Sequence, residues 1–292
     1  MNRTSNHKTT PGGRSTRLRT ANRHSDSGGP GPVRECKPKP SGKIPRKTHT
    51  FIGTFNIQTL IQTGKLHNLT TELTKQKIRI LAVQETRFTD SDTMDYNNYR
   101  IFKSGTNKRV CKGAALFGMA FMVEKSILDS VIDINPINNR LMTMRIKFTN
   151  KYYTLINVHA PTNGANKKEP EKTEEFWQEL ELRMSKIPKE DVKILLGDFN
   201  AQIGQEKRYR KTVERYPAHK FTNKNGMRLI DLCRQNNLKI MSTSKMKNPK
   251  RQKTWRSPIQ HLGEFQIDHV AISYDYQKEV HDIQVRRDLG LT

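Results

Sequence analysis

The chain has few cysteines, and they lie far apart. Its 292 residues contain three of them, Cys36, Cys111 and Cys233. An odd number of widely spaced cysteines argues against a disulfide framework and is typical of a protein in a reducing compartment. Because no Cys-x-x-Cys pair occurs, a structural zinc site is not expected either.

Long hydrophobic runs are also missing. The N-terminus is polar and basic, and no run of about 18 apolar residues occurs anywhere in the sequence. We therefore expect an intracellular, soluble protein with no signal peptide, no transmembrane segment and no membrane partner.

Acidic residues are scarce compared with basic ones. The 53 lysines and arginines exceed the 28 aspartates and glutamates, which gives a net charge of +25. Such a charge favours a polyanionic partner, with nucleic acid ahead of an anionic membrane. It does not indicate a reaction, because nucleic-acid-binding proteins and nucleases share this property.

Residues 1–48 are rich in basic residues and contain almost no large aliphatic side chains. Such a segment buries too little apolar surface to offset its chain entropy, so we predict a disordered basic tail followed by one domain over residues 49–292. The cluster from Lys43 to Lys47 has two interpretations: a nuclear-localisation or DNA-tethering signal, or solvated chain without a role. We expect the protein in the nucleus.

From residue 51 the pattern changes to alternating strands and helices. Strands are predicted over residues 51–57, 78–83, 152–158, 192–196 and 238–241, with a final pair over 265–273 and 279–286. Helices are predicted over 66–73, 176–187 and about 227–236, the second of them with Thr173 as its N-cap. This α/β pattern fits either two sheets packed face to face with helices outside or one large sheet.

Polar side chains follow several of these strands directly. Such positions are where α/β folds place their active sites. The residues are Asn56, Glu85, His159, Asp198 and Asn200, and Asp268 lies within the predicted strand 265–273. Each one alone is more often a solvated or structural residue, but together they bring carboxylates, amides and an imidazole to strand ends.

These residue types can perform a narrow range of chemistry. Carboxylates with water and a phosphate oxygen suit Mg²⁺, which prefers oxygen ligands. An Asp beside an Asn can hold and deprotonate a water molecule, and a His can stabilise or protonate a crowded phosphorane. The expected reaction is metal-assisted hydrolysis of a phosphate ester.

Five segments carry a resemblance to a known family. They are Thr54–Leu60, Leu81–Arg87, Asn157–Pro161, Leu196–Asn200 and Gln266–Val270. In this order they resemble the endonuclease/exonuclease/phosphatase superfamily, which includes deoxyribonuclease I. The chain is most similar to endonuclease domains of non-LTR retrotransposons of the RTE or craniofacial-development-protein-2-like type.

The resemblance implies a four-layer α/β sandwich, DNA as partner and Mg²⁺ as cofactor, with Mn²⁺ as an alternative. It implies that Glu85 is the principal metal ligand and that Asn56 beside it belongs to the metal site, where it orients the metal or its water. Asp198 and Asn200 correspond to the pair that positions the attacking water and the scissile phosphate. His159 corresponds to a group that stabilises the transition state or protonates the leaving group, and Asp268 to a carboxylate that orients a catalytic histidine.

DNA contacts are expected from Arg87, Trp255 and Arg256, supported by the basic stretch 245–256. Trp255 resembles an aromatic residue that packs near the target nucleotide, and packing in the protein core is its equally weighted alternative.

The sequence departs from the family at its end. The Ser-Asp-His segment that supplies the family's general-base histidine does not occur before Thr292. We therefore expect a C-terminally truncated domain that lacks the last strand and whose activity is impaired. Three functions stay open: a DNA endonuclease, an inactive nucleic-acid or chromatin binder, and a phospholipid or inositol-phosphate phosphatase.

Overall fold

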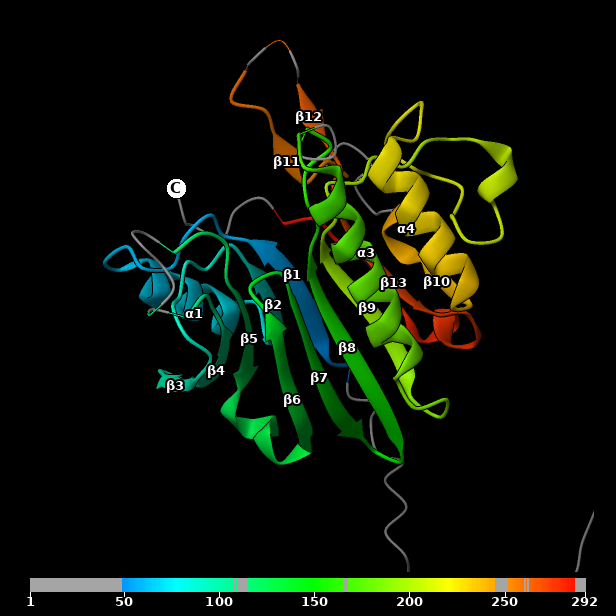
Figure 1. Ribbon diagram of the computed structural model, residues 1–292. Coiled ribbons are helices and arrows are strands. Elements are labelled where there is room, and N and C mark those ends of the chain that lie inside the picture. Colours follow the sequence, from blue (N-terminus) through cyan, green and yellow to red (C-terminus); the bar gives the residue numbers. More distant parts are fainter. Residues whose placement is uncertain are drawn as a thin grey trace, which may run out of the picture. The chain divides into compact units, whose positions relative to one another are not determined.

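A computed structural model describes residues 49–286, apart from 108, 110–114, 165–167, 245–251, 260 and 262. Two β-sheets face each other, and helices cover their outer faces (Figure 1). Of the two predicted architectures, the structure therefore has two sheets packed face to face with helices outside, and not one large sheet. The predicted basic tail, its boundary near residue 48 and the cluster from Lys43 to Lys47 lie outside the described residues.

The first sheet has five strands in the order β1-β2-β5-β4-β3. Their bounds are Phe51–Asn56 (β1), Ile78–Gln84 (β2), Met119–Glu124 (β5), Tyr99–Ser104 (β4) and Thr93–Tyr96 (β3). β1 and β2 are parallel, so both strands end at one edge, with Asn56 opposite Gln84.

The second sheet has six strands in the order β10-β13-β9-β8-β7-β6. Their bounds are Leu238–Ile240 (β10), Asp268–Ser273 (β13), Val192–Asp198 (β9), Lys151–His159 (β8), Leu141–Phe148 (β7) and Val131–Asn138 (β6). β8 and β9 are the parallel pair of this sheet, and they place His159 opposite Asp198.

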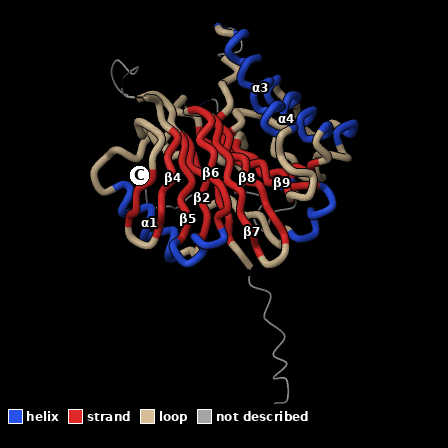
Figure 2. The backbone as a smooth tube through the Cα atoms, turned by 60° about the horizontal axis from the view of Figure 1, so that its bottom comes forward, coloured by secondary structure: helices blue, strands red, loops and turns tan. Residues whose placement is uncertain are grey.

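In the described part of the chain, helices α1, α3 and α4 cover the outer faces of the sheets (Figure 2). Their bounds are Lys65–Lys75 (α1), Pro170–Ser185 (α3) and Lys224–Gln235 (α4). α1 packs its buried Leu69 and Leu73 on the first sheet, because these residues recur on one helical face. α3 and α4 bury their apolar faces on the second sheet.

A separate apolar core lies between the sheets. It is formed by inward-facing residues of both sheets, among them Ile80, Ala82, Phe121, Met144 and Leu155. Successive residues of a strand point to opposite faces, so the continuous apolar runs seen in the sequence fill this core and an outer core at the same time.

Short elements complete the fold. They are the 3₁₀ turns Lys125–Ser130, Lys207–Tyr209, Met241–Thr243 and Tyr274–Glu279, and the two-stranded ribbon of Trp255–Arg256 (β11) and Glu264–Phe265 (β12). None of the helices in the described ranges is long and apolar enough to cross a membrane.

Two predictions of local structure were wrong, a strand and a helix N-cap. Residues 279–286 form no strand: Tyr276, Val280 and Ile283 pack instead against the core between the sheets, at a spacing that does not match strand alternation. Thr173 is not an N-cap, because α3 starts earlier at Pro170, whose fixed φ suits the first helical position. The hydroxyl of Thr173 donates to the carbonyl of Glu169 within the first turn.

The strand predicted over residues 265–273 is also shorter than expected. It begins at Asp268, since Glu264 and Phe265 pair with β11 and not with the main sheet. Asp268 is therefore the first residue of β13, directly opposite Asp198 of β9.

Candidate active site

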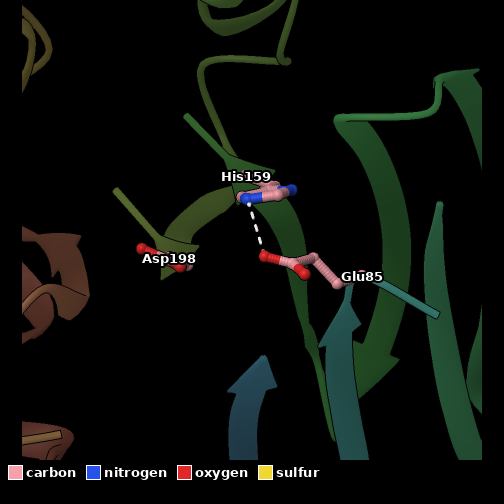
Figure 3. A group of neighbouring side chains, drawn as sticks. All are labelled: Glu85, His159 and Asp198. Carbon is pink, nitrogen blue, oxygen red and sulfur yellow. Dashed lines mark ion pairs between the residues drawn. The ribbon is translucent and has the colours of Figure 1, made fainter. Parts of the chain in front are cut away.

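The ends of strands from both sheets meet at one place (Figure 3). Glu85 follows β2, while His159 and Asp198 end β8 and β9. One ligand-type atom from each of these residues lies within 4.8 Å of the others. The predicted convergence of a carboxylate pair and an imidazole is therefore present.

Asn56 ties the two carboxylates together. Its Nδ2 donates to Oε1 of Glu85 at 2.8 Å and to Oδ2 of Asp198 at 2.9 Å. Its Oδ1 accepts from the backbone N–H of Gln58 at 3.1 Å. In this arrangement the nitrogen of Asn56 bridges the two carboxylates and its oxygen accepts from the backbone, and its expected role at the metal stays a prediction.

Backbone geometry presents these side chains. Glu85 and Asn200 have φ of 54° and 49°, in the left-handed region that few non-glycine residues adopt. Such conformations concentrate at functional sites, where the surrounding structure holds them. The Asn200 backbone N–H donates to Oδ1 of Asp198 at 2.9 Å, and this bond fixes the carboxylate after the strand turns.

The close packing of β8 and β9 requires a glycine before Asp198. Gly197 has φ of 146°, and a Cβ atom there would lie 2.0 Å from the carbonyl oxygen of Val158. The glycine thus permits the approach that sets Asp198 beside His159.

Asn200 uses its side chain structurally. Its Nδ2 donates to the backbone carbonyl of Ala160 at 2.9 Å. The backbone carbonyl of Asn200 accepts from the side chains of Asn163 and Asn223. Asn200 thus joins the loops after β8 and β9 to the N-terminus of α4. Its predicted contact with water and phosphate stays a prediction.

Burial sets the charge of His159. The ring is 4 % exposed. Burial, and next the positive charge of Arg140, lowers the pKa of His159 to about 3, so the imidazole is neutral at physiological pH. Its Nε2 lies 3.4 Å from Oε1 of Glu85. A neutral imidazole suits hydrogen bonding or ligation better than protonation of a leaving group.

The pKa values of two nearby carboxyl groups, Asp198 and Asp268, are raised. Burial raises the pKa of Asp198, and the negative charge of Glu85 adds to this, while hydrogen bonds from Asn56 and Asn200 oppose it. Burial and the neighbouring Asp198 raise the pKa of Asp268. Carboxylates crowded in this way favour a bound cation, because it offsets their mutual repulsion.

Asp268 was expected to orient a histidine. Its backbone N–H donates to Oγ1 of Thr254 at 3.3 Å. A side-chain hydrogen bond with Thr254 lowers the pKa of Asp268, but burial and the charge of Asp198 raise it by more. The adjacent His269 points elsewhere, between Oγ of Ser242 and the carbonyl of Ala201. Within the described residues, Asp268 is paired with Thr254.

Arg140 was missed from the sequence. It lies in the turn between β6 and β7, where its Nη1 donates to the His159 carbonyl at 3.1 Å and its guanidinium lies 3.7 Å from the centre of the Phe117 ring. The charges of Glu85 and Asp198 act on it, although burial has the larger effect and lowers its pKa. No motif marks this turn, so only the tertiary contact identifies it.

The residues predicted to contact DNA are exposed and are not members of the Glu85, His159 and Asp198 group. Trp255 is 37 % exposed and its ring centre lies 5.8 Å from that of Phe265, so the side chain is not part of the core. Arg256 forms an ion pair with Glu264 at 2.7 Å, which offsets its charge. Arg87 is exposed two residues after Glu85.

The donor set fits a divalent cation. Glu85 and Asp198 offer carboxylate oxygens, Asn56 holds both in place, and the site is open enough that Glu85 keeps 28 % of its side chain exposed. Two oriented carboxylates at an accessible strand edge are what Mg²⁺ or Mn²⁺ needs, with room left for water.

Comparisons with known proteins find relatives in sequence. Craniofacial development protein 2 of Tragulus javanicus is 28% identical over 240 residues, which are 82% of this chain and 40% of that protein. The chain spans about two fifths of the length of the curated relatives it matches. The predicted resemblance to this type of protein is confirmed.

Solved structures share the fold. The endonuclease domain of TRAS1, a telomere-specific non-LTR retrotransposon, superposes with a TM-score of 0.53 at 16% identity, over 81% of this chain and 90% of that one. The 3′ phosphatase NExo from Neisseria, bound to a product DNA hairpin, gives 0.53 at 16% identity, over 78% and 88%. Residues 53–274 match the Endonuclease/Exonuclease/phosphatase family, which places this chain in that family.

Proposed function

We propose that this protein hydrolyses phosphodiester bonds in DNA with the help of Mg²⁺, Mn²⁺ being the alternative cofactor. The observation that carries the proposal is the convergence of Glu85, His159 and Asp198 at the shared edge of two sheets. The net charge of +25 favours a polyanion as substrate. The match to a TRAS1 endonuclease domain supports DNA over a small phosphate ester.

Glu85 and Asp198 would hold the cation, and Asn56 would keep both carboxylates in place. A bound divalent cation neutralises charge on the scissile phosphate and orients it. His159, neutral at physiological pH, would donate a hydrogen bond to a phosphate oxygen and so stabilise the crowded transition state.

Asp198 would also position the attacking water beside the cation. The backbone N–H of Asn200 fixes one of its oxygens. A bound divalent cation lowers the pKa of such a water, which makes it a better nucleophile at neutral pH.

Arg140 would contact the same phosphate. Its guanidinium is held against Phe117 and lies close enough for the charges of Glu85 and Asp198 to act on it. A planar guanidinium can give two hydrogen bonds to a phosphate, which a lysine cannot reproduce.

A substrate panel tests the proposal. The purified protein is given supercoiled plasmid DNA, an inositol polyphosphate and phospholipid vesicles, each with Mg²⁺ and again with EDTA. The proposal predicts that only the plasmid is cleaved and that EDTA abolishes cleavage. Phosphate release from the inositol polyphosphate or the lipid without plasmid cleavage would indicate a phosphatase, and salt-sensitive DNA binding without cleavage would indicate an inactive binder.

A further inference from the structure

A buried hydrogen bond joins the two sheets directly below the candidate active site. Nε2 of Gln84 on β2 donates to Oδ1 of Asn157 on β8 at 2.6 Å. Both side chains are 0 % exposed. Gln84 precedes Glu85, and Asn157 lies two residues before His159 on the same face of β8.

The two amides replace apolar side chains in the core between the sheets. On β2, Ile80 and Ala82 face this core, and Gln84 continues the same face. On β8, Leu155 does so and Asn157 continues it. A polar pair in such a place requires desolvation of both amides, and Oε1 of Gln84 is buried without a hydrogen-bond partner in the described structure. Apolar residues would fill this space without that cost.

The pair holds more than its own two strands. Nε2 of Gln84 also reaches Oγ1 of Thr54 on β1 at 3.0 Å. Nδ2 of Asn157 donates to the carbonyls of Val83 at 3.2 Å and Ala120 at 3.0 Å. Strands β1, β2 and β5 of one sheet are thereby tied to β8 of the other at the level just below the site.

The next residues above this bond are the ones that form the site. Glu85 belongs to one sheet and His159 to the other, and their facing atoms lie 3.4 Å apart. Apolar packing between sheets is not directional, so it permits small sliding movements, whereas a short hydrogen bond fixes both distance and register. A cation held by groups of both sheets depends on that spacing.

We propose that Gln84 and Asn157 are positioning residues whose buried amide–amide bond sets the spacing of Glu85 from His159 and Asp198, and so the affinity for the divalent cation. This inference rests on the proposed function, because it assumes that these groups hold a cation. Supporting groups around metal ligands commonly change affinity by roughly 10–100-fold when they are removed.

The test compares variants by Mn²⁺ calorimetry without DNA and by thermal unfolding. The double variant Gln84→Met/Asn157→Leu replaces both amides with apolar side chains of similar shape. It also removes the donors to Thr54, Val83 and Ala120, so it is expected to fold with a lower melting temperature than the wild type. Its Mn²⁺ affinity is expected to fall by roughly 10-fold or more.

Single changes of length provide a rescue experiment. Gln84→Asn removes one methylene group from the bridge and Asn157→Gln adds one, so each alone is expected to weaken Mn²⁺ binding. The double swap restores the combined length and is expected to recover part of the affinity. A purely structural role would not produce recovery of metal affinity.

The matched control is Thr154→Val, on the same strand β8. It removes a buried side-chain hydrogen bond of equal length, from Oγ1 of Thr154 to Asp191 at 2.6 Å. This variant is expected to lower the melting temperature and leave Mn²⁺ affinity unchanged. If the amide variants behave in the same way as Thr154→Val, the inference is overturned.

The remaining outcomes separate the inference from the proposed function. A wild type that binds Mn²⁺ but cleaves no DNA contradicts the proposed function, and the variants still decide the inference. A wild type that cleaves DNA, with amide variants that bind Mn²⁺ normally, contradicts the inference alone. A wild type that binds no Mn²⁺ overturns both.

Discussion

Nε2 of His159 lies 3.4 Å from Oε1 of Glu85, although the two residues come from different sheets. The contact exists because parallel strand pairs in both sheets end at the same edge of the molecule. The candidate site is therefore a property of how the sheets are registered against each other.

Replacement of Arg140 should reduce catalysis more than folding. In Arg140→Lys the charge remains but the planar contact with Phe117 and the double hydrogen bond to a phosphate are lost. We expect the rate of DNA cleavage to fall by about 10²-fold, the size of effect seen when one donor to a transition-state oxyanion is removed. The measurement is single-turnover cleavage of plasmid DNA.

Arg100→Lys is the control for this change. Arg100 is an exposed arginine on β4 that pairs with Asp95. Equal cleavage rates in Arg140→Lys and wild type would show that Arg140 does not act on the substrate.

Removal of the Trp255 side chain should weaken DNA binding without affecting stability. The residue is 37 % exposed on a two-stranded ribbon outside the main sheets, so little core packing is lost. Stacking of a base on an aromatic side chain contributes about 1–3 kcal/mol, and Trp255→Ala should lower DNA affinity accordingly. Fluorescence anisotropy with labelled DNA checks this, and Tyr274→Ala, an exposed tyrosine on a different element, is the control. Unchanged affinity would remove Trp255 from the DNA-binding surface.

Acid should destabilise the protein through His269. Burial lowers its pKa to about 4, below the ordinary value of 6.5. Between these values the unfolded chain binds the proton more tightly than the folded protein, so stability is full above pH 6.5 and is lost as pH falls towards about 4. The shift corresponds to about 3 kcal/mol.

His269→Gln isolates this effect, because a glutamine amide can still donate to the carbonyl of Ala201. Chemical unfolding at several pH values should show a smaller loss of stability between pH 6.5 and 4 in the variant than in the wild type. Parallel curves for the two proteins would assign the acid sensitivity to other groups.

Gly197→Ala should prevent normal folding. The added Cβ would lie 2.0 Å from the carbonyl oxygen of Val158, and backbone atoms on both strands would have to separate. We expect a loss of several kcal/mol, in the range that single substitutions rarely reach. Thermal unfolding measures it, and Gly64→Ala serves as the comparison because its Cβ would meet nothing within 4 Å, although its φ of 80° adds some strain. A melting temperature like that of the wild type would show that β8 and β9 are not so close.

Much of the fold could be predicted from the sequence. The buried strands were visible because residues such as Leu81 and Val83 belong to uninterrupted apolar runs, and α1 because Leu66, Leu69 and Leu73 recur at helical spacing. The prediction of a strand over residues 279–286 was wrong because the apolar residues of this stretch pack against the core between the sheets, which only the tertiary structure defines.

The candidate site was predictable to a similar extent. Glu85, His159 and Asp198 each lie at or just after the end of a strand, so their positions marked them before any contact was known. Arg140 and the bond between Gln84 and Asn157 could not be found in this way, because their meaning lies in contacts between segments distant in the sequence. The direction of the Asn56 amide, with nitrogen and not oxygen towards the carboxylates, likewise depends on three-dimensional partners.

The most direct test of the central claim is plasmid nicking by wild type, Glu85→Gln and Asp198→Asn with Mg²⁺. These substitutions remove charge at nearly constant shape, and Glu179→Gln on α3, which breaks only a helical ion pair with Arg183, is the matched control. Wild type and Glu179→Gln are expected to nick DNA at equal rates, while the two site variants lose activity by several orders of magnitude. Nicking that persists at the wild-type rate in both site variants would contradict the claim.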